Sequence, residues 1–431
     1  MTQPYENIAE KKTFDSYQVF MIVVLAFLQF TIILDFMVLS PLGVIVMPKL
    51  HINAAQFSRV VSSYALCAGI FGFIAAGFMD RFDRKRLLLF FYTGFIGGTA
   101  LCAFADTYEF LLGARIVTGI FGGAIGAISF AIITDIFRVE TRGRVMGFVQ
   151  MAFAASQVLG LPIGLYLANE LSWHAPFLMI ALIGALMGVV ILLFMKPVAE
   201  HLKMRPDKNP FVHLAHTVSN SAYIRAFLGT SLLATGGFML MPFGSNFAIY
   251  NLGLTMKQLP YLYAITGIFS ILFGPLIGVL SDKIGKYVTF LGGTIISLVM
   301  VIVYTNLGVT AFAIIATFNV ILFVGISARM ISASALMTSV PEAVDRGAFM
   351  SINSSIQQIS GGIASFVAGM LVYQEPSGKM DHYPTLGYVV GGSMIVAALL
   401  MFSVNKYVKA KMSRIAQQQL QHQPVTESLN V

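Results

Sequence analysis

The chain has 431 residues, of which 57% are hydrophobic and only 11% are charged. Its mean hydropathy of +0.81 excludes a single soluble domain, because a soluble fold of this length needs far more polar surface. The net charge of +8 does not indicate nucleic-acid binding, since the lysines and arginines occur in short groups between apolar runs, as in loops beside a membrane.

Twelve apolar runs follow one another along the chain. They cover residues 19–47, 57–79, 87–106, 109–135, 145–168 and 174–195, then 224–250, 257–280, 287–306, 309–338, 347–373 and 385–407. Each run can cross a hydrocarbon core of about 30 Å as a helix that rises about 1.5 Å per residue. The runs are continuously apolar, which argues against membrane strands, whose residues alternate. The sequence therefore predicts an all-α membrane protein with twelve transmembrane helices.

Polar segments divide these runs into two sets of six. Residues 196–223 contain three prolines and mixed charge, which predicts a cytoplasmic linker, with room for a short interfacial helix, between bundles of residues 1–195 and 224–407. The tail of residues 408–431 has few apolar residues and is predicted to be disordered. The first sixteen residues are polar and the run after them is too long for a signal peptide, so we expect no cleavable leader.

Lysine and arginine are distributed unequally between the two sides of the membrane. With both termini in the cytoplasm, 21 of the 27 lie on the cytoplasmic side and 4 on the outer side, while Arg115 and Arg329 lie inside helices. Because cytoplasmic loops carry the excess of positive charge, this distribution predicts a multi-pass protein of the inner membrane with cytoplasmic termini.

Two loop segments recur about 200 residues apart. "AGFMDRFDRKR" (76–86) has a counterpart in "GVLSDKIGK" (278–286), and "TRGRVMG" (141–147) has one in "DRGAFMS" (345–351). Corresponding loops indicate a duplicated six-helix unit with pseudo-symmetric halves. Repeats of this kind place the substrate path at the interface between the halves.

The first of these loops resembles the loop 2–3 motif of the major facilitator superfamily, G-x-x-x-D-R-x-G-R-[KR]. Asp80, Arg81, Arg84 and Lys85 match it, whereas Ala76 and Asp83 stand where the family has glycine, and we can assign no role to Asp83. The second copy keeps Gly278, Asp282 and Gly285. The resemblance covers all twelve runs.

Two helices narrow the resemblance to one branch. Residues 111–123, with Arg115, Gly119 and Gly122, resemble the helix 4 motif of proton-driven drug antiporters. Residues 156–168 resemble in part the helix 5 motif of antiporters through Gly160, Pro162 and Gly164, where Pro162 can bend the helix. The branch resembled is the twelve-helix bacterial drug and sugar:proton efflux group.

Asp35 is an ionisable residue deep inside the first helix. A charged carboxylate is costly in hydrocarbon, so such residues face the bundle interior and carry function by default. Arg115 lies roughly 10 Å and Asp35 about 18 Å below the outer ends of their helices at 1.5 Å per residue. We therefore expect an Asp35–Arg115 pair that couples transport to protons. Arg115 could instead extend outward to lipid headgroups or pair with Glu109.

Other polar residues inside helices are candidates for a substrate cavity or gate. Arg329 could bind an anionic substrate group or cap backbone carbonyls. The uncharged candidates could line the cavity or form interhelical hydrogen bonds, and they are Gln29, Asn246, Asn353, Gln357 and Gln358.

The charged loop 2–3 is expected to have two roles. Arg84, Lys85 and Arg86 fix the loop in the cytoplasm. Asp80 and Arg81 are expected to form a latch between the halves in the outward-open state. In this hypothesis Asp80 accepts hydrogen bonds at the start of the helix near Gly347, where the helix dipole favours an anion, and Arg81 reaches Asp135.

Nothing in the chain indicates an enzyme, a cofactor or a metal site. There is no phosphate-binding G-x-x-x-x-G-K-[ST] motif and no zinc-type motif. Cys67 and Cys102 lie in apolar runs and are interpreted as packing residues. His201, His213 and His216 of the linker are interpreted as solvated.

The predicted function is secondary active transport by alternating access. We expect proton-coupled export of a small amphipathic or sugar-like molecule by a monomer whose partners are its substrate, protons and the lipid bilayer. The alternatives are an uptake symporter or facilitator for a metabolite or organic anion, and a membrane sensor that transports nothing. A sensor would need a large soluble domain, for which the linker and tail are too short.

Overall fold

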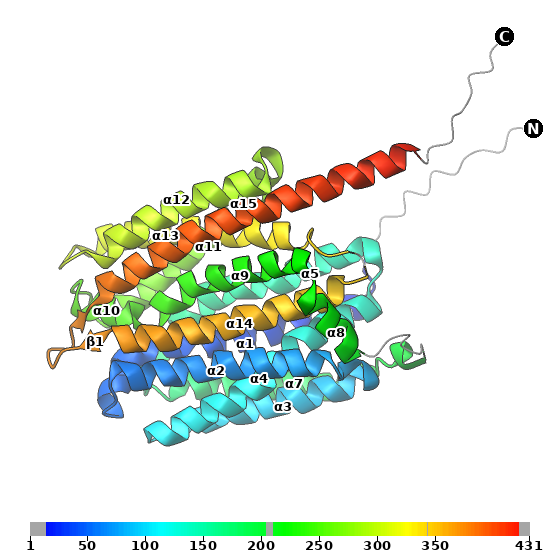
Figure 1. Ribbon diagram of the computed structural model, residues 1–431. Coiled ribbons are helices and arrows are strands. Elements are labelled where there is room, and N and C mark those ends of the chain that lie inside the picture. The colour runs from blue at the N-terminus through cyan, green and yellow to red at the C-terminus, as the bar shows by residue number, and fades with distance from the viewer. Residues whose placement is uncertain (1–13, 204–209, 343, 422–431) are drawn as a thin grey trace, which may run out of the picture.

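The structure is a computed structural model that describes residues 14–203, 210–342 and 344–421. Long helices run side by side and form one bundle (Figure 1). The predicted all-α fold is confirmed by these helices.

In the described part of the chain, seven α-helices form the N-terminal half of the bundle, called the N-half below. They are α1 (Ser16–Lys49), α2 (Ala54–Ala76), α3 (Arg84–Ala103), α4 (Tyr108–Ile136), α5 (Val139–Ala155), α6 (Leu161–Glu170) and α7 (Ala175–Phe194). A 3-10 turn, η1 (Met79–Arg81), precedes α3, and a π-helical segment, η2 (Ser156–Gly160), joins α5 to α6.

The linker holds a 3-10 turn, η3 (Glu200–Lys203), and the short helix α8 (Pro210–Ser219). The C-terminal half, called the C-half below, follows. Its helices are α9 (Ser221–Leu240), the 3-10 turn η4 (Met241–Phe243), α10 (Gly244–Tyr250), α11 (Leu259–Ile284), α12 (Lys286–Thr305), α13 (Phe312–Met337), α14 (Arg346–Leu371) and α15 (Tyr383–Gln421).

Eleven helices of the described chain are long and apolar enough to cross a membrane, one fewer than expected. The helix that falls short is α14, although it has 26 residues. Seven of the ten residues between positions 351 and 360 are Ser, Asn or Gln, which lowers its hydropathy. This polar helix packs between α2 of the N-half and α9 of the C-half, and of its seven polar residues between positions 351 and 360 only Ser354 is exposed.

The C-terminal end differs from the expected disordered tail. Helix α15 continues to Gln421 and projects beyond the other helices (Figure 1). Residues 408–421 are rich in Ala, Lys, Arg, Gln and Met, which favour helix. Val408 packs in the C-half core, and Lys411 donates to the Pro341 carbonyl over 2.7 Å. The rest of the predicted tail, residues 422–431, lies outside the described residues.

The two ends of the bundle are called the linker end and the hairpin end, after the elements that lie there. The linker end carries α8 and the end of α15, and is the end that the charge distribution predicts to be cytoplasmic. The hairpin end carries a two-stranded antiparallel hairpin of β1 (Tyr373–Gln374) and β2 (Met380–Asp381) between α14 and α15. Gly378 turns this hairpin with a φ of 88°, a conformation that favours glycine.

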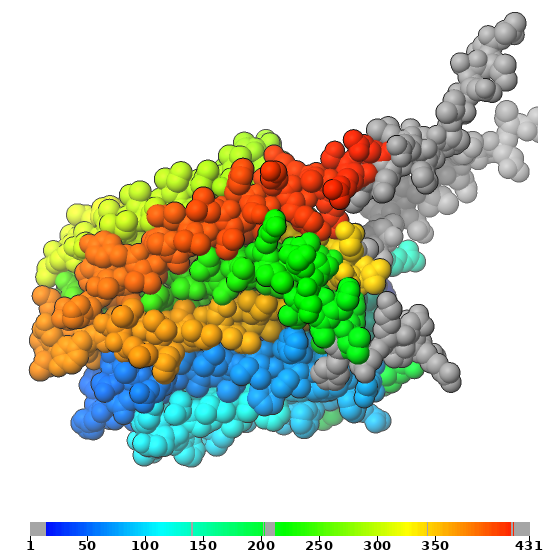
Figure 2. Space-filling model, viewed as in Figure 1, coloured from blue at the N-terminus to red at the C-terminus, as the bar shows by residue number. Residues whose placement is uncertain are grey.

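Helices α2 and α14 form a close seam between the halves. Figure 2 shows them in contact along their length with no hollow between them on this face. A Cβ on Gly69 would come within 2.5 Å of Ile359, and one on Gly362 within 2.7 Å of Leu66, so the helices touch where they lack side chains. The Ser58 hydroxyl donates across the seam to the Ser365 carbonyl.

The hydrophobic core is shared between the halves at the hairpin end and divided at the linker end. The shared core contains residues of both halves, such as Leu39 and Phe57 with Phe243 and Phe247. At the linker end one core belongs to the N-half alone. The other belongs to the C-half and α8, and among its partly buried neighbours only Phe73 and Ala76, both of α2, come from the N-half. The bundle is therefore sealed at the hairpin end.

The helix that was expected to bend contains the π-helical segment η2. It ends at Gly160, two residues before Pro162, which lies in the first turn of α6. A Cβ on Gly160 would come within 2.6 Å of Leu34, and one on Gly164 within 3.1 Å of Val38. The two glycines thus let this helix approach α1, and π-helical segments are frequent at functional sites.

Candidate functional site

Asp35 and Arg115 form an ion pair inside the N-half. Arg115 Nη1 of α4 lies 2.7 Å from Asp35 Oδ2 of α1, and neither side chain is exposed to any extent. Thr99 of α3 donates to Asp35 Oδ1 over 3.0 Å. The expected contact is therefore present. The alternatives for Arg115 are not, because its side chain is buried and Glu109 is exposed at the helix end.

The rest of the Arg115 guanidinium faces an aromatic ring. Its central carbon lies 4.5 Å from the ring centroid of Tyr64 on α2. Its Nε and Nη2 are buried without a hydrogen-bond partner among the described residues. The glycines of the helix 4 motif explain this arrangement: a Cβ on Gly119 would come within 2.5 Å of the Tyr64 carbonyl oxygen, and one on Gly122 within 2.9 Å of its hydroxyl.

Protonation of Asp35 would change this arrangement. The pair holds its two charges only while Asp35 is ionised, because a proton on the carboxyl removes the attraction and leaves Arg115 without its counter-charge. A carboxyl whose protonation changes its contacts is what proton coupling requires. The coupling role of the pair stays a prediction.

The uncharged polar candidates do not form a single cluster. Gln29, Asn353, Gln357 and Gln358 are half-buried. Asn353 accepts a 2.6 Å hydrogen bond from Thr230 of α9, which is an interhelical contact. Asn246, by contrast, is fully buried in the sealed layer at the hairpin end and donates to Met47 Sδ over 3.6 Å.

Arg329 is a second buried cation, in α13 of the C-half. It is 3% exposed, and its Nε and Nη2 have no partner among the described residues. Its guanidinium carbon lies 5.8 Å from the ring centroid of Phe290. A Cβ on Gly236 of α9 would come within 3.7 Å of its Nη1, so the side chain points across the C-half rather than along its own helix.

The charged loop 2–3 makes a clamp, but with Arg84 rather than Arg81. Arg84 donates to Asp80 Oδ1 over 2.7 Å and to Asp135 Oδ2 over 3.0 Å. Arg81 is exposed in η1 and makes no ion pair with the described residues. The expected Arg81–Asp135 contact is wrong because the side chain of Arg84, at the start of α3, points back toward η1 and the end of α4.

The contact of Asp80 with the start of α14, which is expected in the outward-open state, is not made among the described residues of this state, whose hairpin end is sealed. Asp80 bonds within its own half, and no contact with Gly347 is recorded. Lys85 donates to the Leu192 carbonyl over 2.9 Å, which ties the loop to the end of α7. In this state the motif holds the linker end of the N-half together.

Asp83 acquires a role in the structure. It is the N-cap of α3, and its carboxylate accepts a 2.9 Å hydrogen bond from the backbone of Arg86. In the second copy the equivalent position is Gly285, which has a φ of 102°. Lys286 follows it and donates to the Ala335 carbonyl over 3.2 Å, while Asp282 is exposed and Gly278 has open space beside it.

The linker helix docks on the C-half through a histidine that was expected to be solvated. His213 Nε2 lies 2.9 Å from Asp345 Oδ1, and Tyr223 donates to Asp345 Oδ2 over 2.8 Å. The hydrogen bond from His213 lowers the pKa of the Asp345 carboxyl. The side chain of His201 lies outside the described residues.

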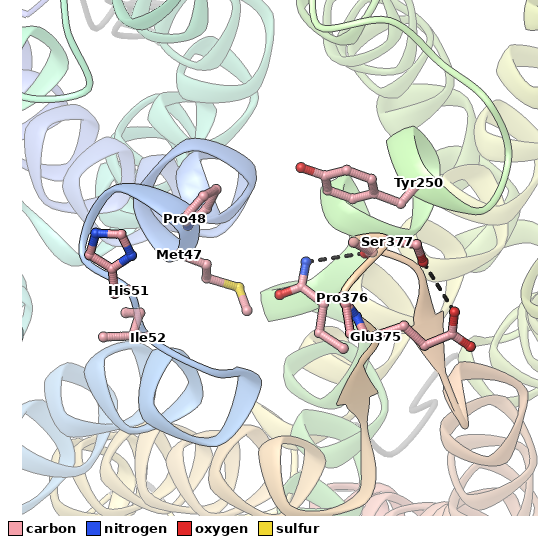
Figure 3. Close-up of a pocket in the computed structure, with 10 residues that line it drawn as sticks. Met47, Pro48, His51, Ile52, Tyr250, Glu375, Pro376 and Ser377 are labelled. Carbon is pink, nitrogen blue, oxygen red and sulfur yellow. Dashed lines mark hydrogen bonds between the residues drawn. The ribbon is translucent and has the colours of Figure 1, made fainter.

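A pocket lies between the halves at the hairpin end. Its volume is about 320 Å³. Met47, Pro48, His51 and Ile52 line it from the N-half, and Tyr250 and residues 374–378 from the C-half (Figure 3). Because it is lined by both halves, its shape must change whenever the halves move apart.

Two partners of the ion pair, Tyr64 and Thr99, were missed by the sequence reasoning. A lone charge in an apolar run is conspicuous, whereas Tyr and Thr are common in membrane helices. Only the knowledge that α2 and α3 pack against α1 and α4 could have identified them.

A bundle of membrane-spanning helices in two halves, with an ion pair buried in one of them, points to a membrane transporter. A family model described as Major Facilitator Superfamily matches residues 25–364 and again residues 226–429. The chain belongs to this superfamily, and it is a transporter rather than an enzyme.

Several relatives are bacterial transporters. The uncharacterized MFS-type transporter YceJ of Bacillus subtilis is 29% identical over 62% of this chain and 68% of its own length. Multidrug resistance protein 3 of Bacillus subtilis is 38% identical over 35% of this chain and 30% of its own length. The class H tetracycline resistance protein of Pasteurella multocida is 26% identical over 55% and 60%, respectively.

Solved structures share the fold at low sequence identity. The D-xylose-proton symporter has a TM-score of 0.69 at 16% identity and covers 89% of this chain and 97% of its own. A bacterial homologue of the lysosomal transporter Spinster, in an inward-facing conformation, has a TM-score of 0.67 at 15% identity over 92% and 97%.

Proposed function

We propose that the protein is a proton-coupled exporter of a small amphipathic or sugar-like molecule in the inner membrane. The observation that carries this proposal is the buried Asp35–Arg115 pair with its Thr99 hydrogen bond. A buried ionisable pair is costly to retain, so it is expected to have a function. Asp35 carries the proton, and Arg115 holds the carboxylate ionised until a proton arrives.

Alternating access is supported by the unequal packing at the two ends of the bundle. The shared core closes the path at the hairpin end, and the divided cores leave the linker end as the side from which substrate enters. In our proposal, substrate leaves when the hairpin end opens, and Asp35, no longer paired with Arg115, takes a proton from the outside. When the hairpin end closes again, the ion pair re-forms and Asp35 gives the proton to the cytoplasm, so protons move inward as substrate moves outward.

Export rests on the resemblance of helices 4 and 5 to antiporters and on the drug-resistance relatives. The ion pair itself is compatible with either direction, so uptake by symport is the second candidate. Both schemes place the proton on Asp35 and differ in whether proton and substrate move in opposite or equal directions.

The test is transport in inverted membrane vesicles with an imposed pH gradient, using tetracycline and ethidium as probes. We expect gradient-driven accumulation of a probe with consumption of the gradient. Asp35→Asn should abolish both, whereas Glu109→Gln, which removes an exposed carboxylate near the start of α4, the helix that carries Arg115, should leave both intact. Gradient-driven transport by Asp35→Asn would refute the coupling role, and co-directional movement of proton and probe would establish symport.

A further inference from the structure

The Asp35–Arg115 pair is connected by aromatic contacts to the junction of the two halves. Arg115 lies over the Tyr64 ring, and the Tyr64 ring centroid lies 5.3 Å from that of Phe36. The Phe36 ring lies 5.4 Å from that of Phe238 on α9 in the C-half. Phe36 also follows Asp35 directly in α1, so the ion pair reaches the opposite half through two routes that meet at one ring.

The Phe36–Phe238 contact lies where the shared core of the hairpin end meets the divided cores of the linker end. Phe36 packs against the N-half core of the linker end, and Phe238 packs against the shared core of the hairpin end. A Cβ on Gly361 of α14 would come within 2.5 Å of the Phe238 ring, so this ring rests on the seam helix. Both rings are half-buried, as expected at the inner edge of the sealed layer.

We propose that Phe36 and Phe238 form the contact between the halves through which protonation of Asp35 opens the hairpin end, with Tyr64 as the positioning residue between the ion pair and the contact. The proposal rests on the proposed coupling role of Asp35. It assigns three aromatic residues to the coupling step, none of which touches the proton.

The physical basis is the loss of fixed neighbours on protonation. While Asp35 is ionised it holds Arg115 through its carboxylate and its carbonyl, at 2.7 and 3.4 Å from Nη1, and Arg115 in turn fixes the Tyr64 ring. When Asp35 is neutral, the buried guanidinium must find other acceptors and leaves the ring. Tyr64 and Phe36 then lose the packing that holds Phe36 against Phe238, and the contact between the halves weakens.

Few other groups can contribute to this titration. The titratable or charged groups that face Asp35 are Arg115 from α4, Tyr64 from α2 and Cys102 from α3, and Thr99 is its neutral donor. None of these neighbours is a carboxylate, so Asp35 is the acid that titrates at this site.

The structure supplies a matched control. Phe57 and Phe243 form the other ring pair between the halves in the described chain, with centroids 6.5 Å apart. This pair lies in the shared core and has no recorded contact with Asp35, Arg115 or Tyr64. Loss of the Phe57–Phe243 contact should weaken the shared core of the hairpin end equally at every pH.

The experiment measures opening of the hairpin end without a substrate. Spin labels on Lys49→Cys and Ser377→Cys, exposed residues of opposite halves, report the distance across that end by pulsed electron paramagnetic resonance. The full chain is reconstituted in lipid nanodiscs with Cys67→Ala, and buried Cys102 is retained. Populations are recorded across a pH series for wild type, Asp35→Asn, Tyr64→Phe, Tyr64→Leu, Phe36→Leu, Phe238→Leu and Phe57→Leu.

We expect acid to raise the open population of the wild type by about thirtyfold, the factor that loss of one desolvated cation–π contact produces. Tyr64→Phe keeps the ring and should keep this response. Tyr64→Leu, Phe36→Leu and Phe238→Leu should lose most of it, and Phe57→Leu should shift the populations while keeping it.

The outcomes separate the two proposals. A response to pH that survives Asp35→Asn overturns the proposed coupling role. A response that is lost in Asp35→Asn but kept in Tyr64→Leu, Phe36→Leu and Phe238→Leu overturns the aromatic connection alone. A loss of response in Phe57→Leu equal to that in Phe36→Leu also overturns it, since any contact between the halves would then suffice.

Discussion

Arg115 in the N-half and Arg329 in the C-half are both buried, but only Arg115 lies against a carboxylate. Each also faces an aromatic ring, Tyr64 for Arg115 and Phe290 for Arg329. The same contrast recurs at the linker end. There Arg84 binds Asp80 and Asp135, whereas Lys286 of the second copy binds a backbone carbonyl.

This difference shows how two duplicated halves can take on different functions. The buried cation of the N-half has a titratable partner, so protons can act on it. The buried cation of the C-half has a fixed charge and no recorded anion, so only a ligand or a structural change can satisfy it. We therefore expect protons to act on the N-half and anionic groups, where they occur, on the C-half.

The largest effect is expected from removing the acidic partner of Arg115. Asp35→Leu leaves a buried guanidinium without its counter-charge, which should lower the free energy of unfolding by about 3–5 kcal/mol. The measurement is reversible unfolding in mixed detergent micelles.

The control for this prediction is the double variant Asp35→Leu/Arg115→Met, which removes both charges. Its stability should return close to that of the wild type, because a buried ion pair replaced by apolar residues is often neutral. A double variant as unstable as the single one would show that the site depends on shape rather than charge.

Arg329→Met should raise the free energy of unfolding rather than lower it. This variant tests the contrast between Arg115 and Arg329 directly. No ion pair of the described residues is lost, and two buried nitrogens without a hydrogen-bond partner are removed, so the free energy of unfolding should rise by about 1 kcal/mol. The same unfolding assay measures it. A loss as large as that of Asp35→Leu would mean that Arg329 has a partner equivalent to Asp35.

At the linker end we expect the stability losses of the two halves to differ by less. Asp135→Asn removes a charged hydrogen bond to Arg84 and should cost about 1–2 kcal/mol, whereas Ser339→Ala removes a 3.5 Å contact to Lys286 and should cost less than about 0.5 kcal/mol. Thermal unfolding of the two variants in parallel tests this. Equal losses would contradict the contrast between the two clamps.

The smallest effect is expected at the docked linker helix. The pKa of Asp345 is lowered in the folded state, so its contribution to stability is present above the unfolded pKa and is lost as pH falls through the folded pKa. Asp345→Asn should therefore lower the unfolding temperature slightly at neutral pH and leave it unchanged in strong acid. A difference that persists in acid would assign the effect to the hydrogen bonds alone.

The sequence was a good guide where a single residue or run carries the signal. Apolar runs predicted the helices closely, as with 109–135 for α4, and a lone acid and base in such runs predicted the Asp35–Arg115 contact. It was a poor guide where the outcome depends on packing between distant segments. The tail was predicted to be disordered because its polarity hid the contacts of Val408 and Lys411 with the C-half.

The loop 2–3 clamp shows a second limit. Arg81 and Arg84 are equally basic and lie three residues apart, so their partners depend on where η1 ends and α3 begins. Asp83 decides that boundary by capping α3, and it is the residue to which the motif gave no role. The aromatic contacts of Phe36, Tyr64 and Phe238 carry no signal in a chain with 36 phenylalanines.

The seam between α2 and α14 has a mechanical consequence. Ile359 of α14 fills the space beside Gly69, and Leu66 of α2 fills the space beside Gly362, so each glycine is a hole that receives a side chain of the opposite helix. Side chains meshed in this way oppose sliding of one helix along the other. The seam therefore fixes the register of α2 against α14 when the halves tilt.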